Sequence, residues 1–352
     1  MNWTVNGHNI LEIILITFLA SLALIPIAKK VANHVGAIDI PDKRKVHKKP
    51  MARMGGIAIF GAFILGYILY GDITTQMISI LIGAFIMFIM GMLDDIKPIR
   101  ARYKFLVQII SAVIVVIYGQ IYFDQISFLG LYIKFSPLVS YILSIFFIVA
   151  ISNAINLIDG LDGLAGGISS IYFFTISSIC LLLGRISGLD FILSIIMLGS
   201  TLGFLVWNFP PAKIFMGDSG SLFLGFMISV IALVGFKVAT LTSLVIPITI
   251  LAIPIFDTVL AIFRRLLKGE SIGAPDKEHF HHQLLKLKFS TRVSILIIYL
   301  INLMFSAASI FYVIGNTKEA IILYLVLLLS LLFVILKTDI LYHHKKDGKK
   351  VK

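Results

Sequence analysis

Apolar residues gather into long runs along this chain, and short polar stretches separate the runs. We place eleven runs, with approximate bounds at 9–28, 54–70, 77–93, 104–123, 136–153, 164–183, 189–207, 219–236, 241–263, 293–314 and 319–337. Runs of roughly 17–25 residues can cross a bilayer as helices, because a helix rises about 1.5 Å per residue and the hydrocarbon core is about 30 Å thick. These runs lack the polar face of helices that lie on the surface of a soluble protein. The pattern predicts an all-α, polytopic integral membrane protein with about 11 transmembrane helices.

The composition agrees with this class. Hydrophobic residues make up 59% of the chain and charged residues 14%, whereas soluble domains are about 25% charged. The one cysteine, Cys180, lies in an apolar run and has no second cysteine with which to form a disulfide within the chain. Basic residues follow the first run at Lys29 and Lys30 and do not precede it, which favours a retained helix over a cleaved signal peptide. We find no internal repeat and no low-complexity linker, and we expect one membrane-embedded domain over residues 1–352.

The distribution of lysine and arginine predicts the orientation of the chain. With the amino terminus outside, the loops on the inner side hold 26 of the 30 basic residues. Cytoplasmic loops of membrane proteins carry such an excess, so we expect the amino terminus outside and the carboxyl terminus in the cytoplasm. The net charge of +12 then reflects topology and contact with anionic membrane lipids, and we expect no nucleic-acid partner.

Five polar motifs interrupt the apolar pattern, and under this topology each lies at the cytoplasmic end of a run. They are LDDIKP (93–98), NAINLIDGLDGLAGG (153–167), WNFPPAKIFMGDSGSLFLG (207–225), FDTVLAIFRR (256–265) and PDKEHFHHQLL (275–285). The outer loops carry only scattered acids. Because ionisable residues near membrane depth are functional candidates, we expect an active site at the cytoplasmic face.

Two pairs of acids are the first candidates. Asp94 and Asp95 end the third run, where acids oppose the helix dipole unless cations or a metal offset them, so we favour a functional pair over a solvated helix end. Asp159 and Asp162 would share one face if they were helical, and nearby glycines allow the backbone to come close to a ligand. An EF-hand is excluded because the further acids that its loop requires are missing. A plain glycine-rich turn is the alternative.

The third motif adds further candidates. Asp218 begins a new run, either as a functional acid or only as a helix N-cap. Asn208 precedes a pair of prolines, where a helix must end, so we expect its amide to be free to face a ligand. Phe215 and Trp207 are either ligand contacts or aromatic residues of the membrane interface.

The last two motifs carry cations. We interpret Asp257, inside the ninth run, as a structural partner of the arginines that close this run more than as a catalyst. His279, His281 and His282 could form a zinc site, but the chain has one cysteine and no H-E-x-x-H arrangement. Histidine and arginine on a cytoplasmic loop fit an anionic, phosphate-bearing ligand better.

Taken together, acids that can hold a divalent cation face a set of lysine, arginine and histidine side chains. Mg²⁺ prefers oxygen ligands and substrate phosphates, and the basic residues would neutralise a diphosphate. Positioning and charge neutralisation supply most of the catalysis in phosphoryl transfer. The pattern therefore predicts a phosphoryl-transfer site, and its depth in the membrane implies that one substrate is a lipid.

The ordered motifs LDD, NLIDGLDGLAGG, FMGDSGS, PIFDTVLAIFRR and HFHHQLL resemble those of the polyprenyl-phosphate N-acetylhexosamine-1-phosphate transferases (glycosyltransferase family 4), over nearly the whole chain. The stretch HKKPMARMGG at 47–56 matches the first cytoplasmic loop of the family. The sequence at 279–282, His-Phe-His-His, is similar to the TagO/WecA type, which uses UDP-N-acetylglucosamine. The MraY type, which uses UDP-N-acetylmuramoyl-pentapeptide, usually has three consecutive histidines there. One departure is Pro98, which stands where the family often has a lysine.

The resemblance implies a reaction in a bacterial plasma membrane. GlcNAc-1-phosphate would pass from UDP-GlcNAc to undecaprenyl phosphate, giving undecaprenyl-diphosphate-GlcNAc and UMP, in the synthesis of a cell-envelope polymer such as wall teichoic acid. It further implies that Asp218 and Asn156 hold Mg²⁺, with Mn²⁺ as an alternative, and that Asp94 and Asp95 lie at the attacking phosphate. A homodimer is one option for the oligomeric state.

The same resemblance implies a set of substrate contacts. Asp159 and Asp162 would shape the uridine side of the pocket, and Phe215 would stack on uracil. The full set comprises Asp159, Asp162, Asn208, Phe215, Arg265, His279, His281, His282, Lys48, Arg53 and Lys104. The alternatives are MraY-type transfer of phospho-MurNAc-pentapeptide in peptidoglycan synthesis and, more remotely, a lipid or solute transporter, for which polar mid-span residues and inverted repeats are expected.

Overall fold

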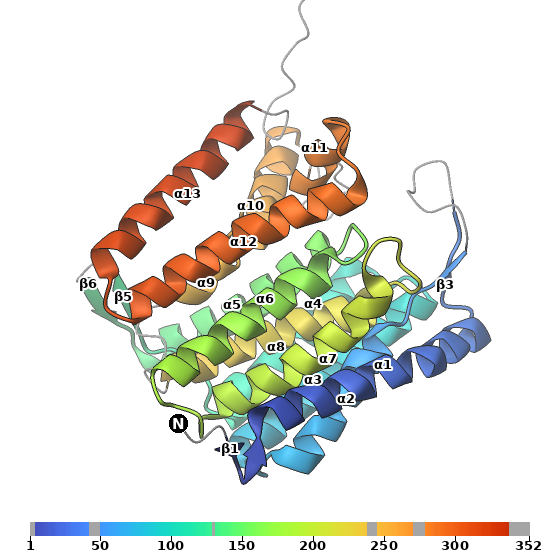
Figure 1. Ribbon diagram of the computed structural model, residues 1–352, viewed down its shortest axis with the longest axis horizontal. Helices are drawn as coiled ribbons and strands as arrows, with labels where there is room; N and C mark the ends of the chain where they lie inside the picture. Colours follow the sequence, from blue (N-terminus) through green and yellow to red (C-terminus); the bar gives the residue numbers. More distant parts are fainter. Residues whose placement is uncertain (1–3, 42–49, 129–130, 238–244, 270–278, 338–352) are drawn as a thin grey trace, which may run out of the picture.

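The computed structural model describes residues 4–41, 50–128, 131–237, 245–269 and 279–337. Within them the fold is a bundle of helices with three two-stranded antiparallel hairpins at its ends (Figure 1). The helices are α1 (Ile10–Val35), α2 (Gly56–Tyr70), α3 (Thr75–Ile96), α4 (Ala101–Val113), the π-helical turn η1 (Ile114–Tyr118), α5 (Pro137–Ile158), α6 (Leu164–Leu182), α7 (Leu189–Asn208), α8 (Gly217–Lys237), α9 (Val245–Ile250), α10 (Ala252–Leu267), α11 (Phe280–Lys286), α12 (Thr291–Val313) and α13 (Thr317–Lys337). The hairpins pair β1 (Thr4–Val5) with β2 (His8–Asn9), β3 (Ile38–Asp39) with β4 (Met51–Ala52), and β5 (Gln125–Phe128) with β6 (Leu131–Lys134).

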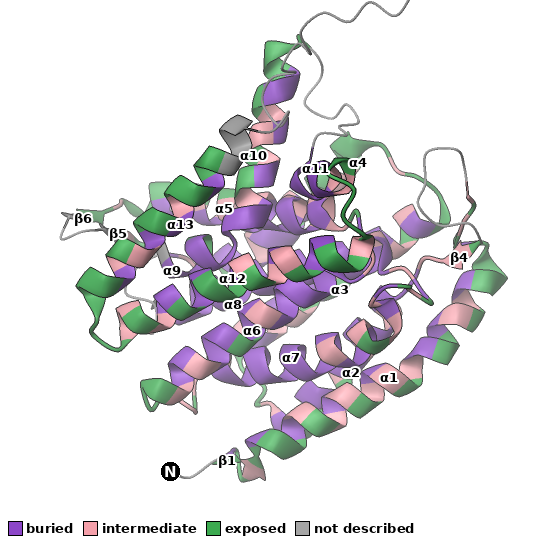
Figure 2. Ribbon diagram, turned by 45° about the horizontal axis from the view of Figure 1, so that its top comes forward, coloured by how far each residue is buried: buried purple, intermediate pink, exposed green. Residues whose placement is uncertain are grey.

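Helix α8 is the axis of the bundle. Residues 219–235 are all buried, and α2, α3, α5, α6 and α7 pack around them. Figure 2 shows the consequence: buried residues dominate the centre, and exposed residues follow the outer faces of the surrounding helices. Helix α1 covers α7 and α2 on one side, while α12 lies on α6 and α13 lies on α12 on the other. Asp218, at the start of α8, is therefore surrounded by several helices at one end of the bundle.

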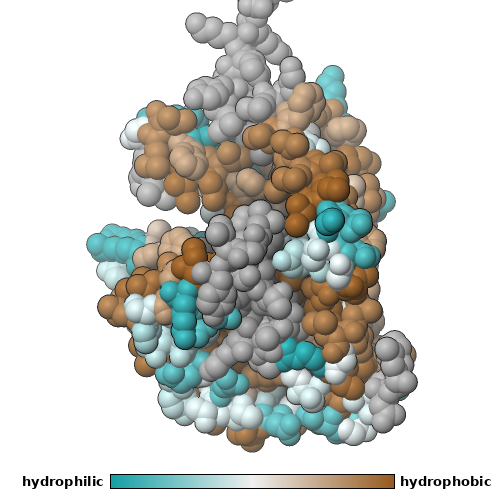
Figure 3. Space-filling model, turned by 90° about the vertical axis from the view of Figure 1, so that its left-hand side faces the viewer, coloured by the Kyte–Doolittle hydropathy of each residue, from teal (hydrophilic) through white to brown (hydrophobic). Residues whose placement is uncertain are grey.

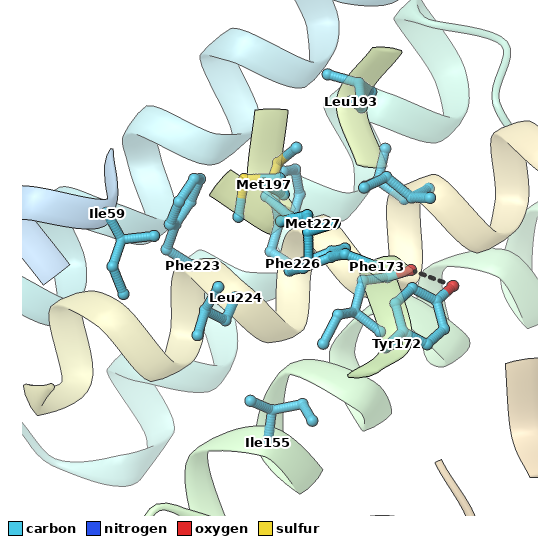
Figure 4. Close-up of a cluster of buried hydrophobic side chains, with 14 of the residues drawn as sticks. Ile59, Ile155, Tyr172, Phe173, Leu193, Met197, Phe223, Leu224, Phe226 and Met227 are labelled. Atoms are coloured by element: carbon cyan, nitrogen blue, oxygen red, sulfur yellow. Dashed lines mark hydrogen bonds between the residues drawn. The ribbon is translucent and has the colours of Figure 1, made fainter. Parts of the chain in front are cut away.

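Large apolar side chains fill the space around α8. Phe223 of α8 packs edge-to-face against Phe60 of α2, with ring centroids 5.2 Å apart, an arrangement that aromatic pairs prefer. Figure 4 shows side chains from α2, α5, α6, α7 and α8 converging on this core. The hydroxyl of Tyr172, which is fully buried, donates to the carbonyl of Ile228 at 3.1 Å, so its polar atom has a partner inside the core.

The outside of the bundle is apolar. Leu11, Leu15 and Leu19 of α1 are 68%, 55% and 49% exposed, and their spacing of four residues puts them on one helix face. Broad hydrophobic patches cover much of the surface shown in Figure 3. Such surfaces are unfavourable in water and are expected where a protein faces lipid. The predicted all-α, multi-pass membrane fold is confirmed.

In the described residues each predicted run overlaps a helix, and residues 241–244 of the run at 241–263 lie outside them. Eight helices in the described part of the chain are long and apolar enough to cross a membrane. Helix α2 has only 15 residues. The run predicted at 241–263 is divided at Leu251 into α9 and α10. Apolar composition cannot reveal such a break. The count of about 11 spans stays a prediction, as does the single domain.

Helix α10 has buried charged side chains and exposed apolar side chains. Its charged side chains Asp257, Arg264 and Arg265 are 3%, 3% and 7% exposed, whereas Phe256 and Phe263 are 38% and 55% exposed. A helix of this kind points its polar face at the protein and its apolar face at lipid. The charged side chains of α10 are therefore held inside the protein, away from lipid.

Candidate active site

The first element of the site is a contact between the end of α3 and the start of α8. Asp95 accepts hydrogen bonds from the backbone N–H of Asp218 at 2.8 Å and of Ser219 at 3.1 Å, and from the Ser219 hydroxyl at 2.7 Å. The first N–H groups of a helix have no partner within it, and a carboxylate there is also stabilised by the helix dipole. Asp95 thus caps α8 from another helix and fixes the residue that carries the Asp218 carboxylate.

A glycine makes this contact possible. Gly217 has φ +74°, and a Cβ at that position would lie 2.4 Å from an oxygen of Asp95 and 2.5 Å from the carbonyl oxygen of Arg53. No L side chain fits that space, and the backbone conformation itself favours glycine. Gly217, the first glycine of FMGDSGS, is therefore required by the close approach of α3. The motif contained this signal, but our interpretation considered only its acid and its serines.

Two cations join the acids. The Nζ of Lys104 lies 2.8 Å from Oδ2 of Asp218 and 3.2 Å from Oδ2 of Asp94. An Arg53 guanidinium nitrogen lies 3.6 Å from Asp95 and 3.8 Å from Asp218. The predicted cost of two acids at the end of α3 is thus offset by cations and by the α8 terminus. Lys104 supplies the positive charge next to Asp94 in a chain that has Pro98 where a lysine was expected.

Arg53 reaches the site because its segment pairs with the chain before α8. The N–H of Phe215 donates to the carbonyl of Ala52 at 2.9 Å, and the N–H groups of Gly55 and Gly56 donate to the carbonyls of Phe215 and Met216. This backbone pairing holds Arg53 next to Asp218 even though 165 positions of sequence separate the two residues.

The second element is the turn between α5 and α6, residues 159–163. Helix α5 ends at Ile158 and α6 begins at Leu164, so Asp159 and Asp162 lie in a turn and do not share a helix face. Asp162 accepts a hydrogen bond from the N–H of Ala212 at 3.0 Å. The turn is therefore tied to the segment that leads into α8.

Asn208 joins the same two segments. Its Oδ1 accepts from the N–H of Gly163 at 2.9 Å, and its Nδ2 donates to the carbonyl of Ile214 at 2.9 Å. The residue is 3% exposed. The expectation that this amide is free is wrong, because both of its polar atoms have backbone partners. Its predicted contact with a nucleotide stays a prediction.

These elements surround an open cavity of about 1010 Å³. The volume is at the upper end of the range for small-molecule sites, about 300–1,000 Å³, and suits a nucleotide sugar better than a single ion. Its lining includes eight residues predicted from the sequence: Arg53, Asn156, Asp159, Asp162, Asn208, Phe215, Asp218 and His282.

Asn156 and Asp159 are two of the lining residues that have side-chain oxygen atoms. Asn156 donates its Nδ2 hydrogen to the Ser221 hydroxyl at 2.8 Å, which fixes the amide and leaves Oδ1 without a hydrogen bond among the described residues. The partly buried Asp159 lies in the turn; desolvation and then the charge of Asp218 raise the pKa of this carboxyl well above its usual range. A cation bound nearby would favour its ionised form.

His281 and His282 lie in a short helix, α11, and His279 directly precedes it, in a region that the sequence predicts as a loop. His279 Nδ1 lies 3.0 Å from Oδ2 of Asp257, and the N–H of Phe280 donates to Oδ1 of the same carboxylate at 2.9 Å. Asp257 thus has a structural role, as expected. The partners seen here, His279 and Phe280, are at the start of α11 and are in addition to any that the arginines provide. It anchors α11 to α10.

His281 packs against the acidic turn. It is 2% exposed, and a Cβ on Gly160 would lie 2.6 Å from its Nε2. Burial, followed by the neighbouring His282, lowers the pKa of His281 to about 3, so it is neutral near pH 7.

The described residues include no group of three or more His, Cys, Asp and Glu side chains suited to a metal. The three histidines therefore do not form the alternative zinc site in this part of the chain.

The remaining predicted residues lie beside the cavity or behind it. Asp95 and Lys104 are connected to the cavity through their contacts with Asp218, Asp94 is connected through Lys104, and the Asp95 side chain is 0% exposed. Its place at the attacking phosphate stays a prediction, and its observed contacts give it a positioning role at the start of α8. Arg265, His279 and His281 are buried and are not among the residues that line the cavity. Lys48 lies outside the described residues.

The structure adds residues that the sequence reading missed. Arg292 lines the cavity together with Ser290 and Thr291 at the start of α12. Its Nε donates to the carbonyl of Pro210 at 2.8 Å. The available signal was a basic residue directly before an apolar run, which we counted only toward topology.

Fold and site define a class: a multi-pass membrane transferase with a cluster of acidic and basic side chains at one end of its bundle. The family model for glycosyl transferase family 4 matches residues 77–236. The chain is 48% identical over 84% of its length to the "Probable undecaprenyl-phosphate N-acetylglucosaminyl 1-phosphate transferase" of Bacillus subtilis (strain 168), of which 83% is covered. The chain belongs to glycosyl transferase family 4.

More distant relatives extend this comparison. The "Decaprenyl-phosphate N-acetylglucosaminephosphotransferase" of Mycobacterium tuberculosis (strain ATCC 25618 / H37Rv) is 32% identical, over 81% of this chain and 78% of the relative. The "Undecaprenyl-phosphate alpha-N-acetylglucosaminyl 1-phosphate transferase" of Escherichia coli (strain K12) is 29% identical, over 80% of this chain and 78% of the relative. The family expected from the motifs is confirmed.

Proposed function

We propose that this protein transfers GlcNAc-1-phosphate from UDP-GlcNAc to undecaprenyl phosphate. A phosphate oxygen of the lipid attacks the sugar-linked phosphorus, the bond from that phosphorus to the bridging oxygen breaks, and UMP leaves. One phosphoanhydride bond is made and one is broken, so the reaction is close to balanced and reversible. The observation that carries the proposal is Asp218, held by Arg53, Lys104 and the Asp95 cap at the edge of a cavity of nucleotide-sugar size in a membrane bundle.

The donor set fits Mg²⁺. Asp218 and Asn156 both line the cavity, and Asn156 offers an oxygen because its amide nitrogen is bonded to Ser221. Mg²⁺ is usually bound by a small number of protein oxygen ligands, and water and substrate phosphates complete its coordination. When bound, Mg²⁺ neutralises charge on the donor diphosphate and polarises its phosphorus. Asp218 and Asn156 would hold it, with Asp159 as an adjacent carboxylate.

The basic residues supply fixed positive charge. Arg53 and Arg292 line the cavity, where guanidinium groups can pair with phosphate oxygens. Lys104, between Asp94 and Asp218, lies where the phosphate of the lipid would meet the diphosphate. The lipid phosphate is largely ionised at pH 7, since its second pKa is about 6, so Asp94 needs to orient this group more than to deprotonate it.

The nucleotide part of the donor would lie toward the turn at 159–163. Phe215 offers a ring on which uracil can stack, and Asp159 and Asp162 border the same side of the cavity. His282 lines it as well, and the buried Arg265, His279 and His281 would support that wall. We propose that the sugar and diphosphate lie between this wall and Asp218.

The orientation and the pathway are also part of the proposal. The excess of basic residues at the end that carries the site supports a cytoplasmic active site, with the amino terminus outside and the carboxyl terminus inside a bacterial plasma membrane. The product would feed a cell-envelope polymer, for which wall teichoic acid is our choice. UDP-MurNAc-pentapeptide as donor is the competing proposal.

The test is an exchange assay with the purified protein, undecaprenyl phosphate and radiolabelled UMP, with each UDP-sugar in turn. We expect label to enter UDP-GlcNAc, activity to stop with EDTA and to return with Mg²⁺, and Asp218→Asn to lower kcat by at least about 10²-fold, the loss typical of a removed electrostatic group. Arg102→Gln, at an exposed position on α4, is the matched control and keeps wild-type rates. Turnover of the pentapeptide donor alone would reverse the choice of substrate, and full activity in EDTA would remove the metal.

A further inference from the structure

The side chains of two lysines lie over the indole ring of Trp207, near the end of α7. The Nζ of Lys29 lies 4.9 Å from the centroid of its ring, and the Nζ of Lys213 lies 5.1 Å from the same centroid. Both distances are within the range of a cation–π interaction, which is about 6 Å. Because the two nitrogens share one ring, they are no more than about 10 Å apart, the sum of these two distances. We call these three residues the Trp207 site.

The positive charge at this site is not balanced by the protein. In the part of the chain that the structure describes, neither Lys29 nor Lys213 has a carboxylate within ion-pair distance. The two ammonium groups repel each other, and the repulsion is stronger near a low-dielectric bilayer than in water. An anion between them would convert this repulsion into two attractive contacts.

The surroundings indicate where such an anion comes from. None of the three residues lines the active-site cavity. Pro26, three residues before Lys29 and so on the same helix face, is exposed, and Val206, next to Trp207, is 57% exposed. Lysine and tryptophan beside exposed aliphatic side chains are typical of the boundary between hydrocarbon and headgroups. A soluble phosphate would use the lysines but would leave this apolar surface uncovered.

We propose that the Trp207 site binds the headgroup phosphate of an anionic phospholipid. Lys29 and Lys213 would contact the phosphate oxygens, the indole would lie at headgroup level, and the acyl chains would lie against the exposed apolar side chains next to them, Pro26 and Val206. Basic residues at a membrane surface bind anionic lipid with about 1 kcal/mol each, which corresponds to about fivefold in affinity.

The site is linked to the cavity wall. Lys213 lies between Ala212, whose N–H is bonded to Asp162, and Ile214, whose carbonyl is bonded to Asn208. Its own N–H donates to the carbonyl of Trp207 at 2.7 Å. A lipid held by Lys213 would restrain this segment and, through it, the turn at 159–163. Anionic lipid is therefore expected to support activity as well as to bind.

The test is native mass spectrometry of the purified, delipidated full-length protein titrated with phosphatidylglycerol. We expect Lys29→Gln/Lys213→Gln to weaken binding of the first lipid about 25-fold, Lys213→Gln alone about fivefold, and Lys29→Arg/Lys213→Arg to retain it. Lys30→Gln, which removes an exposed charge from the same helix, is the matched control and changes affinity less than about twofold.

Three outcomes overturn the proposal. The double glutamine variant binds phosphatidylglycerol like wild type, or phosphatidylcholine binds wild type as tightly as phosphatidylglycerol does, or inorganic phosphate displaces the lipid at equal concentration. Because Lys213 is exposed, its single variant keeps the test valid if the double variant fails to fold. Lipid binding is read without turnover, so this result is independent of the proposed reaction.

Discussion

Asp95 gives the sharpest test of how this site is built. We expect Asp95→Ala to remove three hydrogen bonds from the start of α8. Two N–H groups then lose their acceptor, at a cost of about 1–3 kcal/mol each, while loss of an N-cap alone costs about 0.5–2 kcal/mol. We therefore expect the free energy of unfolding to fall by ~2–4 kcal/mol. Asp218 would no longer be held in place, and a displacement of about 1 Å can lower the rate about 10²-fold.

Asp95→Asn separates a positioning role from a chemical one. Asparagine is as good an N-cap as aspartate and keeps one acceptor oxygen at the same place. We expect this variant to lose less than about tenfold in kcat, with Mg²⁺ half-saturation close to wild type, because its remaining oxygen still caps α8 and holds Asp218 in place. Asp94→Asn, made in parallel, should lose at least about 10²-fold without a comparable loss of stability.

The assay combines UMP release over a Mg²⁺ titration with thermal unfolding in detergent. The reasoning is refuted if Asp95→Asn is as inactive as Asp95→Ala while its unfolding temperature stays at the wild-type value, because the carboxylate would then take part in the reaction. It is equally refuted if Asp95→Ala matches wild type in both measurements, because α8 would not depend on this cap.

Three further predictions follow from other contacts in the site. Lys104→Met leaves Asp94 and Asp218 without their shared ammonium group, and we expect kcat/KM to fall about 10²–10³-fold, with partial recovery in Lys104→Arg; equal rates in all three proteins would contradict a bridging role. Asn208→Ala leaves two backbone groups without partners, so we expect a loss of about 2–5 kcal/mol in unfolding free energy and a raised KM for UDP-GlcNAc, whereas a rise in KM alone would point to direct contact with the substrate. For His281, whose folded pKa is lowered to about 3, the unfolded chain takes up the proton first as the pH falls, so stability is complete above about pH 6.5 and declines by about 1.4 kcal/mol per pH unit below it; unfolding curves of His281→Leu should lack this component, and an unchanged pH profile would show that His281 is not the group responsible.

The sequence by itself determined the class of the protein and the location of its chemistry. Apolar runs predicted membrane helices because burial in lipid depends on the hydrophobicity of each segment taken alone. The motifs around Asp94, Asp159, Asp218 and His282 lie at one end of the bundle, as the alternation of spans required. Family membership was also readable, since it rests on short ordered motifs.

Tertiary structure decided what individual residues do. The partner of Asp95 is 123 positions away at Asp218, and the two partners of Asn208 lie on different segments. An acid that caps another helix and an acid that faces a substrate look alike in the sequence, because composition records that a carboxylate is present and not which donors surround it. The break at Leu251 and the short helix at Phe280–Lys286 were hidden for a related reason. Their hydrogen bonds and burial depend on elements that pack together only in the folded chain.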